Sequence, residues 1–83
     1  MRVLYFAWLR EKTGVGQEEL SPPAEVNTPR ALAAWLAGRG PGHAAAFANM
    51  ALIRCAVDRE FVDLDATLGG AAEVAFFPPV TGG

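Results

Sequence analysis

The sequence predicts a single α+β domain, in which a mixed sheet is covered by one main helix. Three observations favour this class. The 83 residues suffice for one domain, several short runs are rich in β-branched and aromatic residues, and one stretch carries apolar residues at helical spacing. Hydrophobic residues make up 52% of the chain, which is enough to build one core.

Two strands are expected near the N-terminus. Arg2–Leu9 is rich in β-branched and aromatic residues and predicts a first strand, and Gln17–Leu20 predicts a short second one. Gly14 and Gly16 bracket a turn between them, so the two strands are expected to form a hairpin. Ser21-Pro22-Pro23 then interrupts the second strand.

The main helix is expected to begin at Thr28-Pro29, because threonine is a favoured N-cap and proline suits the first helical position. Leu32, Trp35 and Leu36 follow at i, i+3 and i+4 and form one apolar face. The glycine-rich segment 38–42 ends the helix.

The second half of the chain predicts one short helix and three strands. His43–Asn49 is rich in alanine and predicts the helix. Two strands at Leu52–Val57 and Glu60–Val62 are joined by the two-residue turn Asp58-Arg59, since aspartate tolerates the left-handed region. The remaining elements are a tight turn at Asp65–Leu68 and a last strand at Glu73–Phe77.

The two faces of this sheet pose a question, because alternate side chains of a strand point to opposite faces and one helix covers only one of them. Either a second layer, such as His43–Met50, covers the other face, or the other face is a partner-binding surface. In the first strand, one face is expected to carry Val3, Tyr5, Ala7 and Leu9 and the other Leu4, Phe6 and Trp8. In the last strand, one face is expected to carry Val74 and Phe76 and the other Ala75 and Phe77.

The chain ends in Pro78-Pro79-Val80-Thr81-Gly82-Gly83, directly after the last expected strand. The prolines stiffen this segment, the glycines fit a slot too narrow for other residues, and six extended residues reach roughly 20 Å at most. These properties favour insertion of the terminal carboxylate into another protein's active site. We therefore expect a folded domain at 1–77 and a flexible tail at 78–83.

The string Phe76-Phe77-Pro78-Pro79-Val80-Thr81-Gly82-Gly83, together with Val3-Leu4-Tyr5-Phe6-Ala7 and the chain length, resembles the MoaD/ThiS family. It most resembles the MoaD-type members, which are small sulfur-carrier subunits of molybdopterin synthase. The resemblance implies a ubiquitin-like β-grasp fold. It also implies a covalent carrier that is not a catalyst alone: Gly83 is adenylated, becomes a thiocarboxylate and donates sulfur to cyclic pyranopterin monophosphate, while Gly82 gives access to a narrow channel.

The same resemblance implies the partners of the chain. A MoeB-like enzyme would use ATP and magnesium to activate Gly83, a cysteine desulfurase is one possible sulfur donor, and two copies would join two MoaE-like large subunits. No cofactor or metal is expected on the chain itself. The expected partner-binding residues are Phe6, Phe61, Phe77, Pro78, Pro79, Val80 and Thr81, with Trp8 as a further candidate.

Composition argues against several other classes. A net charge of −2 provides no basic stripe for nucleic acid. The apolar run Val3–Leu9 is too short to span a membrane, so a cytoplasmic protein is expected. Cys55, the single cysteine, excludes an internal disulfide and is expected to be a small buried hydrophobe. His43 is expected in a surface or capping role.

Two alternatives remain open. The tail chemistry also fits a carrier for thiamine synthesis, tRNA thiolation or protein tagging, and the fold also fits a passive binding module with an inert terminus.

One segment departs from the family pattern, because Gly70-Ala71-Ala72-Glu73 stands where members often have Asp-Gly-Asp-Glu. We expect this turn to lose its usual left-handed glycine.

Overall fold

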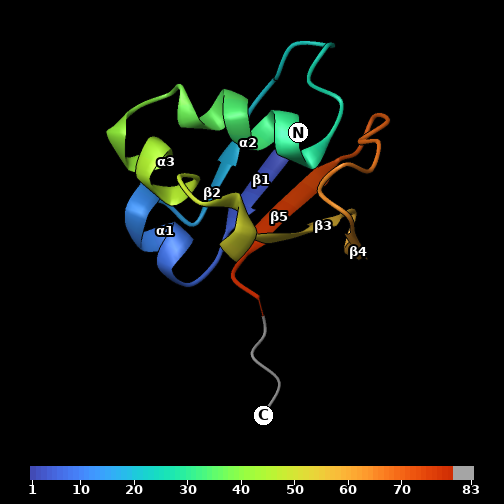
Figure 1. Cartoon of the computed structure of the whole chain (residues 1–83). Coiled ribbons are helices and arrows are strands. Elements are labelled where there is room, and N and C mark those ends of the chain that lie inside the picture. The colour runs from blue at the N-terminus through green and yellow to red at the C-terminus, as the bar shows by residue number, and fades with distance from the viewer. Residues whose placement is uncertain (80–83) are drawn as a thin grey trace.

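The computed structural model describes residues 1–79, which form one five-stranded sheet with helices on one side (Figure 1). The central strand β5 is parallel to β1 and antiparallel to β3. The sheet is therefore mixed, which confirms the predicted α+β class. The strand order is β2-β1-β5-β3-β4, with β1 at Arg2–Tyr5, β2 at Gln17–Glu19, β3 at Arg54–Val57, β4 at Glu60–Val62 and β5 at Glu73–Phe77.

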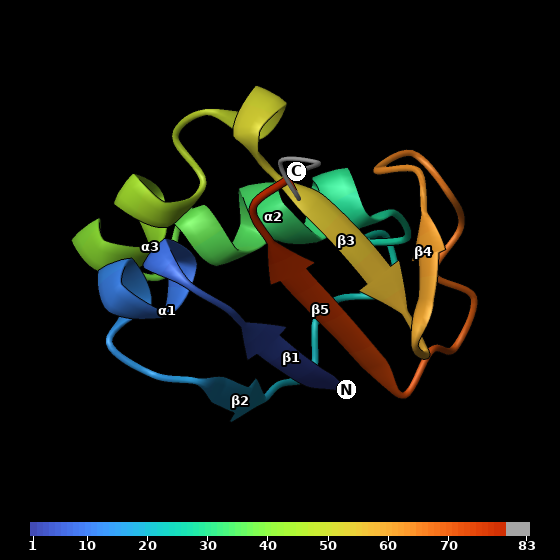
Figure 2. The ribbon, with the colours of Figure 1, turned by 90° about the horizontal axis from the view of Figure 1, so that it is seen from below.

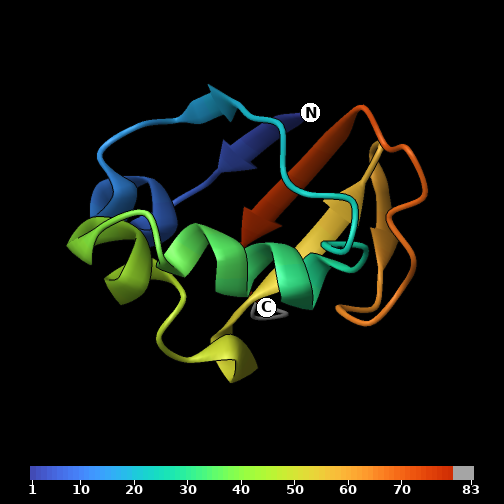
Figure 3. The same cartoon turned by 90° about the horizontal axis from the view of Figure 1, so that it is seen from above.

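The main helix α2 (Pro29–Ala37) crosses one face of the sheet (Figure 3). It begins as predicted: the Thr28 hydroxyl accepts a hydrogen bond from the Ala31 N–H at 3.0 Å, and proline is the first helical residue. Leu32 and Leu36 are fully buried. The predicted apolar face of this helix therefore contacts the core.

The strand predicted over Arg2–Leu9 is too long. β1 ends at Tyr5, and the helix α1 (Trp8–Thr13) follows. Ala7 turns the chain out of the sheet with φ 54° and ψ −132°, and Gly14 ends the helix with φ 82°. A short apolar run does not by itself distinguish a strand from a helix.

This helix changes the predicted hairpin. β1 and β2 pair in an antiparallel manner as expected, with Val3 opposite Glu18, but α1 occupies the connection between them. α1 packs against a second short helix, α3 (Pro41–Ala46). Gly42 permits this packing, because a side chain there would collide with the carbonyl of Lys12.

The boundaries of the next two elements differ from the prediction. The helix expected at His43–Asn49 is α3, which begins earlier because a proline suits the first turn of a helix. The 3₁₀ turn η1 (Met50–Leu52) follows, and the Asn49 side chain caps it. Because η1 uses these residues, β3 begins at Arg54, later than predicted.

Asp58 and Arg59 form the predicted two-residue turn between β3 and β4. Both have positive φ, 48° and 70°, as the favoured hairpin turns require. The Asp58 carboxylate also accepts hydrogen bonds from the N–H groups of Ala72 and Glu73, at 2.9 and 3.0 Å. This turn residue therefore ties the hairpin to the start of β5.

The loop before β5 corrects two expectations. Its first turn is closed by a hydrogen bond from the Ala66 N–H to the Asp63 carbonyl at 3.0 Å, earlier than the predicted Asp65–Leu68. Gly69 and Gly70 take φ of 57° and 61°. The turn therefore does not lose its left-handed glycine, contrary to the expectation from the sequence. Gly69 and Gly70 adopt that conformation.

The core lies between the sheet and the helices. Phe47, which follows α3, packs its ring 5.0 Å from that of Phe76 and 6.2 Å from that of Tyr5. The segment His43–Met50 therefore covers the same face as α2. Figure 2 shows the other face with no helix in front of β1, β5, β3 and β4. In the described part of the chain, the second layer considered from the sequence does not cover that face.

Candidate functional site

The uncovered side of the sheet, called here the open face, is built by strand register. Leu4 lies opposite Ala75, Ala75 opposite Ala56, and Ala56 opposite Phe61, so these four side chains form one row across four strands. Phe6, Arg54 and Phe77 lie next to this row, toward the end of β5. The open face thus places three phenylalanines at one end of the sheet.

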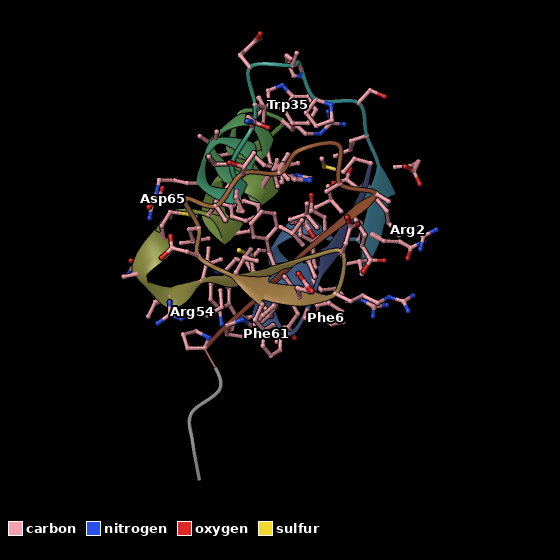
Figure 4. All side chains as sticks on the ribbon, turned by 90° about the vertical axis from the view of Figure 1, so that its right-hand side faces the viewer. Arg2, Phe6, Trp35, Arg54, Phe61 and Asp65 are labelled. Atoms are coloured by element: carbon pink, nitrogen blue, oxygen red, sulfur yellow. The ribbon has the colours of Figure 1, made fainter. Side chains whose placement is uncertain are left out.

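We call Phe6, Phe61 and Phe77 the aromatic patch. The rings of Phe61 and Phe77 pack with centroids 5.5 Å apart. Phe6 donates its backbone N–H to the Phe76 carbonyl at 3.1 Å, which places it beside the end of β5. Phe61 is 82% exposed and Phe6 48% exposed, and Figure 4 shows both where the chain leaves the sheet. Large aromatic side chains gathered at the surface are typical of a protein interface.

A small cavity lies within this region. It has a volume of about 240 Å³ and is lined by Arg54, Cys55, Phe61, Val62 and Phe77. Its walls are almost wholly apolar, and Arg54 is the one charged residue that lines it. We call this cavity the notch. It is large enough for one apolar side chain of a partner.

The expected tail begins next to the aromatic patch. β5 ends at Phe77, and Pro78 and Pro79 are half-buried. Val80, Thr81, Gly82 and Gly83 lie outside the described residues. The division at 77/78, the carrier roles of Gly82 and Gly83, and the partner-binding roles of the tail and of the aromatic patch therefore stay predictions.

Trp8 is not part of the open face. It belongs to α1, and its half-buried side chain packs against the core. The expectation that it shares a face with Phe6 is wrong, because Ala7 ends the strand alternation before Trp8 is reached.

Cys55 is a buried hydrophobe, as expected. It is 2% exposed, and its thiol contacts the Val62 carbonyl at 3.4 Å. Burial raises the pKa of this thiol to about 11, with a smaller contribution from Asp63. The thiol is therefore neutral at physiological pH and unsuited to act as a nucleophile.

A polar cluster on the core side was not found from the sequence. The Glu18 carboxylate accepts a hydrogen bond from the Tyr5 hydroxyl at 2.7 Å and lies 2.8 Å from His43 Nε2. Burial alone would raise the pKa of Glu18, but the hydrogen bonds from His43 and Tyr5 outweigh it and lower the pKa. Three residues from β1, β2 and α3 meet here, and no spacing pattern indicates such a contact. His43 thus links two layers of the fold.

The described residues offer no further site of a familiar kind. Residues 1–79 contain no group of three histidine, cysteine, aspartate or glutamate side chains arranged to hold a metal ion. Within the same range, every helix is too short or too polar to cross a lipid bilayer. The features of the described chain that point to a function are therefore the aromatic patch and the notch.

Comparison with known proteins places these features in a family. Residues 3–83 match the ThiS family. Two relatives, from Escherichia coli (strain K12) and Haemophilus influenzae (strain ATCC 51907 / DSM 11121 / KW20 / Rd), are each named molybdopterin synthase sulfur carrier subunit. They are 39% and 35% identical over 83 residues, which cover 100% of this chain and 99% of each relative.

Two solved structures share the fold. SAMP1 from Haloferax volcanii has a TM-score of 0.72 at 24% identity, over 100% of this chain and 98% of that one. A putative molybdopterin converting factor, subunit 1, from Pyrococcus furiosus has a TM-score of 0.66 at 25% identity, over 95% of both chains. These likenesses confirm the predicted ubiquitin-like β-grasp fold.

Proposed function

We propose, because the chain belongs to the ThiS family, that it is the sulfur-carrying small subunit of a molybdopterin synthase. The observation that carries the proposal is the end-to-end match, at 39% and 35% identity, to two proteins named molybdopterin synthase sulfur carrier subunit. This match favours molybdopterin over thiamine synthesis or tRNA thiolation as the pathway served.

The chemistry of the proposal takes place at the C-terminus. The Gly83 carboxylate, with an ordinary pKa of about 3.3–3.7, is ionised at neutral pH and does not acylate on its own. Attack on ATP forms an acyl adenylate and releases pyrophosphate. Sulfide, or its equivalent from a donor, then attacks the carbonyl and expels AMP, which leaves a thiocarboxylate. The sequence contains no phosphate-binding glycine motif, so a MoeB-like partner would supply the site for ATP and magnesium.

The second half of the proposal concerns delivery of the sulfur. A thiocarboxylate at Gly83 enters a MoaE-like large subunit and donates its sulfur to cyclic pyranopterin monophosphate. Because a dithiolene has two sulfur atoms, each product requires two charged carriers. The assembly would contain two small and two large subunits.

The aromatic patch supports this delivery. Phe6 and Phe61 lie near the exit of the chain (Figure 4), and Phe77 directly precedes Pro78, so a surface that receives the tail also faces the patch. Burial of an aromatic side chain in an interface is a common source of binding energy. The patch would hold the large subunit while Gly82 and Gly83 reach its active site.

The proposal is tested by reconstituting molybdopterin synthesis from the thiocarboxylated chain, a MoaE-like large subunit and cyclic pyranopterin monophosphate. A variant without Gly83 is the matched control, because it keeps the fold and the aromatic patch. We expect this variant to bind the large subunit but to form no molybdopterin. If the shortened chain supported synthesis as well as the full chain, the terminus would be inert and the protein a passive binding module.

A further inference from the structure

The notch beside the tail carries a charged group that the proposed function leaves unexplained. Arg54 lies opposite Phe77 in the register of β3 and β5, on the open face. It lines the notch together with Phe61 and Phe77, and Figure 4 shows Arg54 and Phe61 side by side next to the exit of the chain. An arginine therefore stands at the rim of an otherwise apolar hollow.

The guanidinium of Arg54 keeps most of its hydrogen-bonding capacity. One of its nitrogens, Nη1, donates to the carbonyls of Ala51 at 3.4 Å and Ile53 at 3.0 Å. A guanidinium carries five N–H groups in all, arranged to bind a carboxylate through two of them at once, and the hydrogen bonds within residues 1–79 use only those of Nη1. Among residues 1–79, no carboxylate lies within 4.0 Å of it.

Two acidic side chains border Arg54 without forming an ion pair with it. Asp63 and Asp65 line a neighbouring hollow that Arg54 also borders. Asp65 pairs with Arg30 at 2.7 Å, and Asp63 accepts a hydrogen bond from the Asp65 N–H at 2.8 Å. Within residues 1–79, Arg54 therefore forms no ion pair.

Docking would change the surroundings of this charge. The surface that takes up the tail must lie over the start of the tail, and Arg54 stands beside that point. A guanidinium covered by an apolar surface without a partner is strongly unfavourable, whereas one that meets a carboxylate is compensated. A partner surface that covers the notch must therefore place a carboxylate next to Arg54.

We propose that Arg54 is a specificity-determining residue of the docking surface, where it binds a carboxylate of the large synthase subunit. That carboxylate lies next to an apolar side chain of the same subunit, which fills the notch between Phe61 and Phe77. The identity of the partner rests on the proposed function; the requirement for a carboxylate rests on Arg54 and the notch. Arg54 therefore selects among possible partner surfaces, while the aromatic patch supplies most of the contact.

The test measures binding of the full-length chain to the purified large subunit by titration calorimetry, at low and high salt. Arg54→Glu reverses the charge, Arg54→Met keeps most of the side-chain length without charge, and Arg54→Lys keeps the charge without the two-pronged geometry. Arg59→Glu is the matched control: it makes the same change in net charge at the opposite end of β3, in the turn. Thermal unfolding of each variant checks that the fold is kept.

We expect Arg54→Glu to weaken binding roughly thirtyfold or more, as for loss of one partner of a covered charge pair. Arg54→Met and Arg54→Lys should fall between this variant and the wild type, and Arg59→Glu should stay within about twofold, as for a charge at the rim. The wild-type affinity should fall with salt more steeply than that of Arg54→Met.

Two results would overturn the inference. Equal and small effects of Arg54→Glu and Arg59→Glu would show that only net charge matters. An Arg54→Met variant that binds as tightly as the wild type at both salt concentrations would show that no carboxylate is engaged. If the unaltered chain itself failed to bind the large subunit, the proposed function would fall first, and the inference with it.

Discussion

The two faces of the sheet are made by the same strands and differ most in the exposure of their aromatic side chains. On the covered face, Val3, Tyr5, Val74 and Phe76 are each at most 1% exposed. On the open face, Phe6 is 48% and Phe61 82% exposed. Strand alternation sends neighbouring residues to opposite environments, so one set of residues holds the fold together and the other is available for binding.

This difference separates stability from function within one small sheet. The helices, which lie on one side, bury the covered face (Figure 1), and removal of apolar area from water there stabilises the fold. The exposed rings of the open face contribute little to the folded chain alone, because their burial would occur only in a complex. Substitutions on the two faces should therefore change different measurements.

The largest effect is expected on the covered face. Phe76→Ala removes a fully buried ring that packs against Phe47 and should lower the free energy of unfolding by about 3–5 kcal/mol. Small domains have a free energy of unfolding of only about 5–15 kcal/mol in total. The variant would therefore keep only a small margin of stability. Urea denaturation measures this loss, and a loss below about 1 kcal/mol would mean that this face is not the core.

The mirror-image substitution lies on the open face. Phe61→Ala should weaken binding to the large subunit by roughly tenfold or more and change the free energy of unfolding by no more than about 0.5 kcal/mol. Calorimetric binding and urea denaturation are measured on the same sample. If Phe61→Ala lost as much stability as Phe76→Ala, or bound the large subunit as tightly as the wild type, the two faces would not have separate roles.

Ala7 marks the place where the chain leaves the sheet, just after Phe6 on the open face. Its φ of 54° and ψ of −132° belong to a region that favours glycine, at a cost of about 1–3 kcal/mol for other residues. Ala7→Gly should therefore raise the free energy of unfolding by about 1 kcal/mol, after an entropic penalty of about 0.5–1 kcal/mol for glycine. A lower melting temperature would show that the Ala7 methyl group makes a contact that outweighs the strain.

The smallest effect is expected at the polar cluster of Tyr5, Glu18 and His43 on the covered face. The pKa of Glu18 is lowered in the folded chain, so its stabilising contribution is present above the unfolded pKa and is lost as pH falls through the folded value. Glu18→Gln should lower stability at neutral pH by about 1 kcal/mol and by less in acid. Parallel melting curves of the two proteins across the acidic range would test this, and a difference that grew in acid would have the wrong sign.

Much of the fold and of the open face could be predicted from the sequence. The helix cap at Thr28, the left-handed turn at Asp58 and Arg59 and the alternation of the last strand are local signals, and each predicted its element correctly. The open face followed from this alternation once a single main helix was assumed. The terminal Gly-Gly string carried the family resemblance.

The errors have physical causes as well. The apolar residues of β1 continue into α1, so the pattern predicted a strand as far as Leu9. The signal that was missed is the run of helix formers Arg10-Glu11-Lys12 followed by Gly14, which is typical of a helix end. The contact of Glu18 with Tyr5 and His43 depends on how α3 packs, which no local pattern specifies. Arg54 was not singled out, because its neighbours across the strands are known only once the register is known.

The most direct test of the central claim is the intact mass of the chain after incubation with a MoeB-like enzyme, ATP and a sulfur donor. The account predicts a mass gain equal to replacement of one oxygen by sulfur, present in the full-length chain and absent when Gly83 is removed. No gain, under conditions in which the Escherichia coli relative is converted by the same enzyme, would contradict the claim that this chain carries sulfur on its C-terminus.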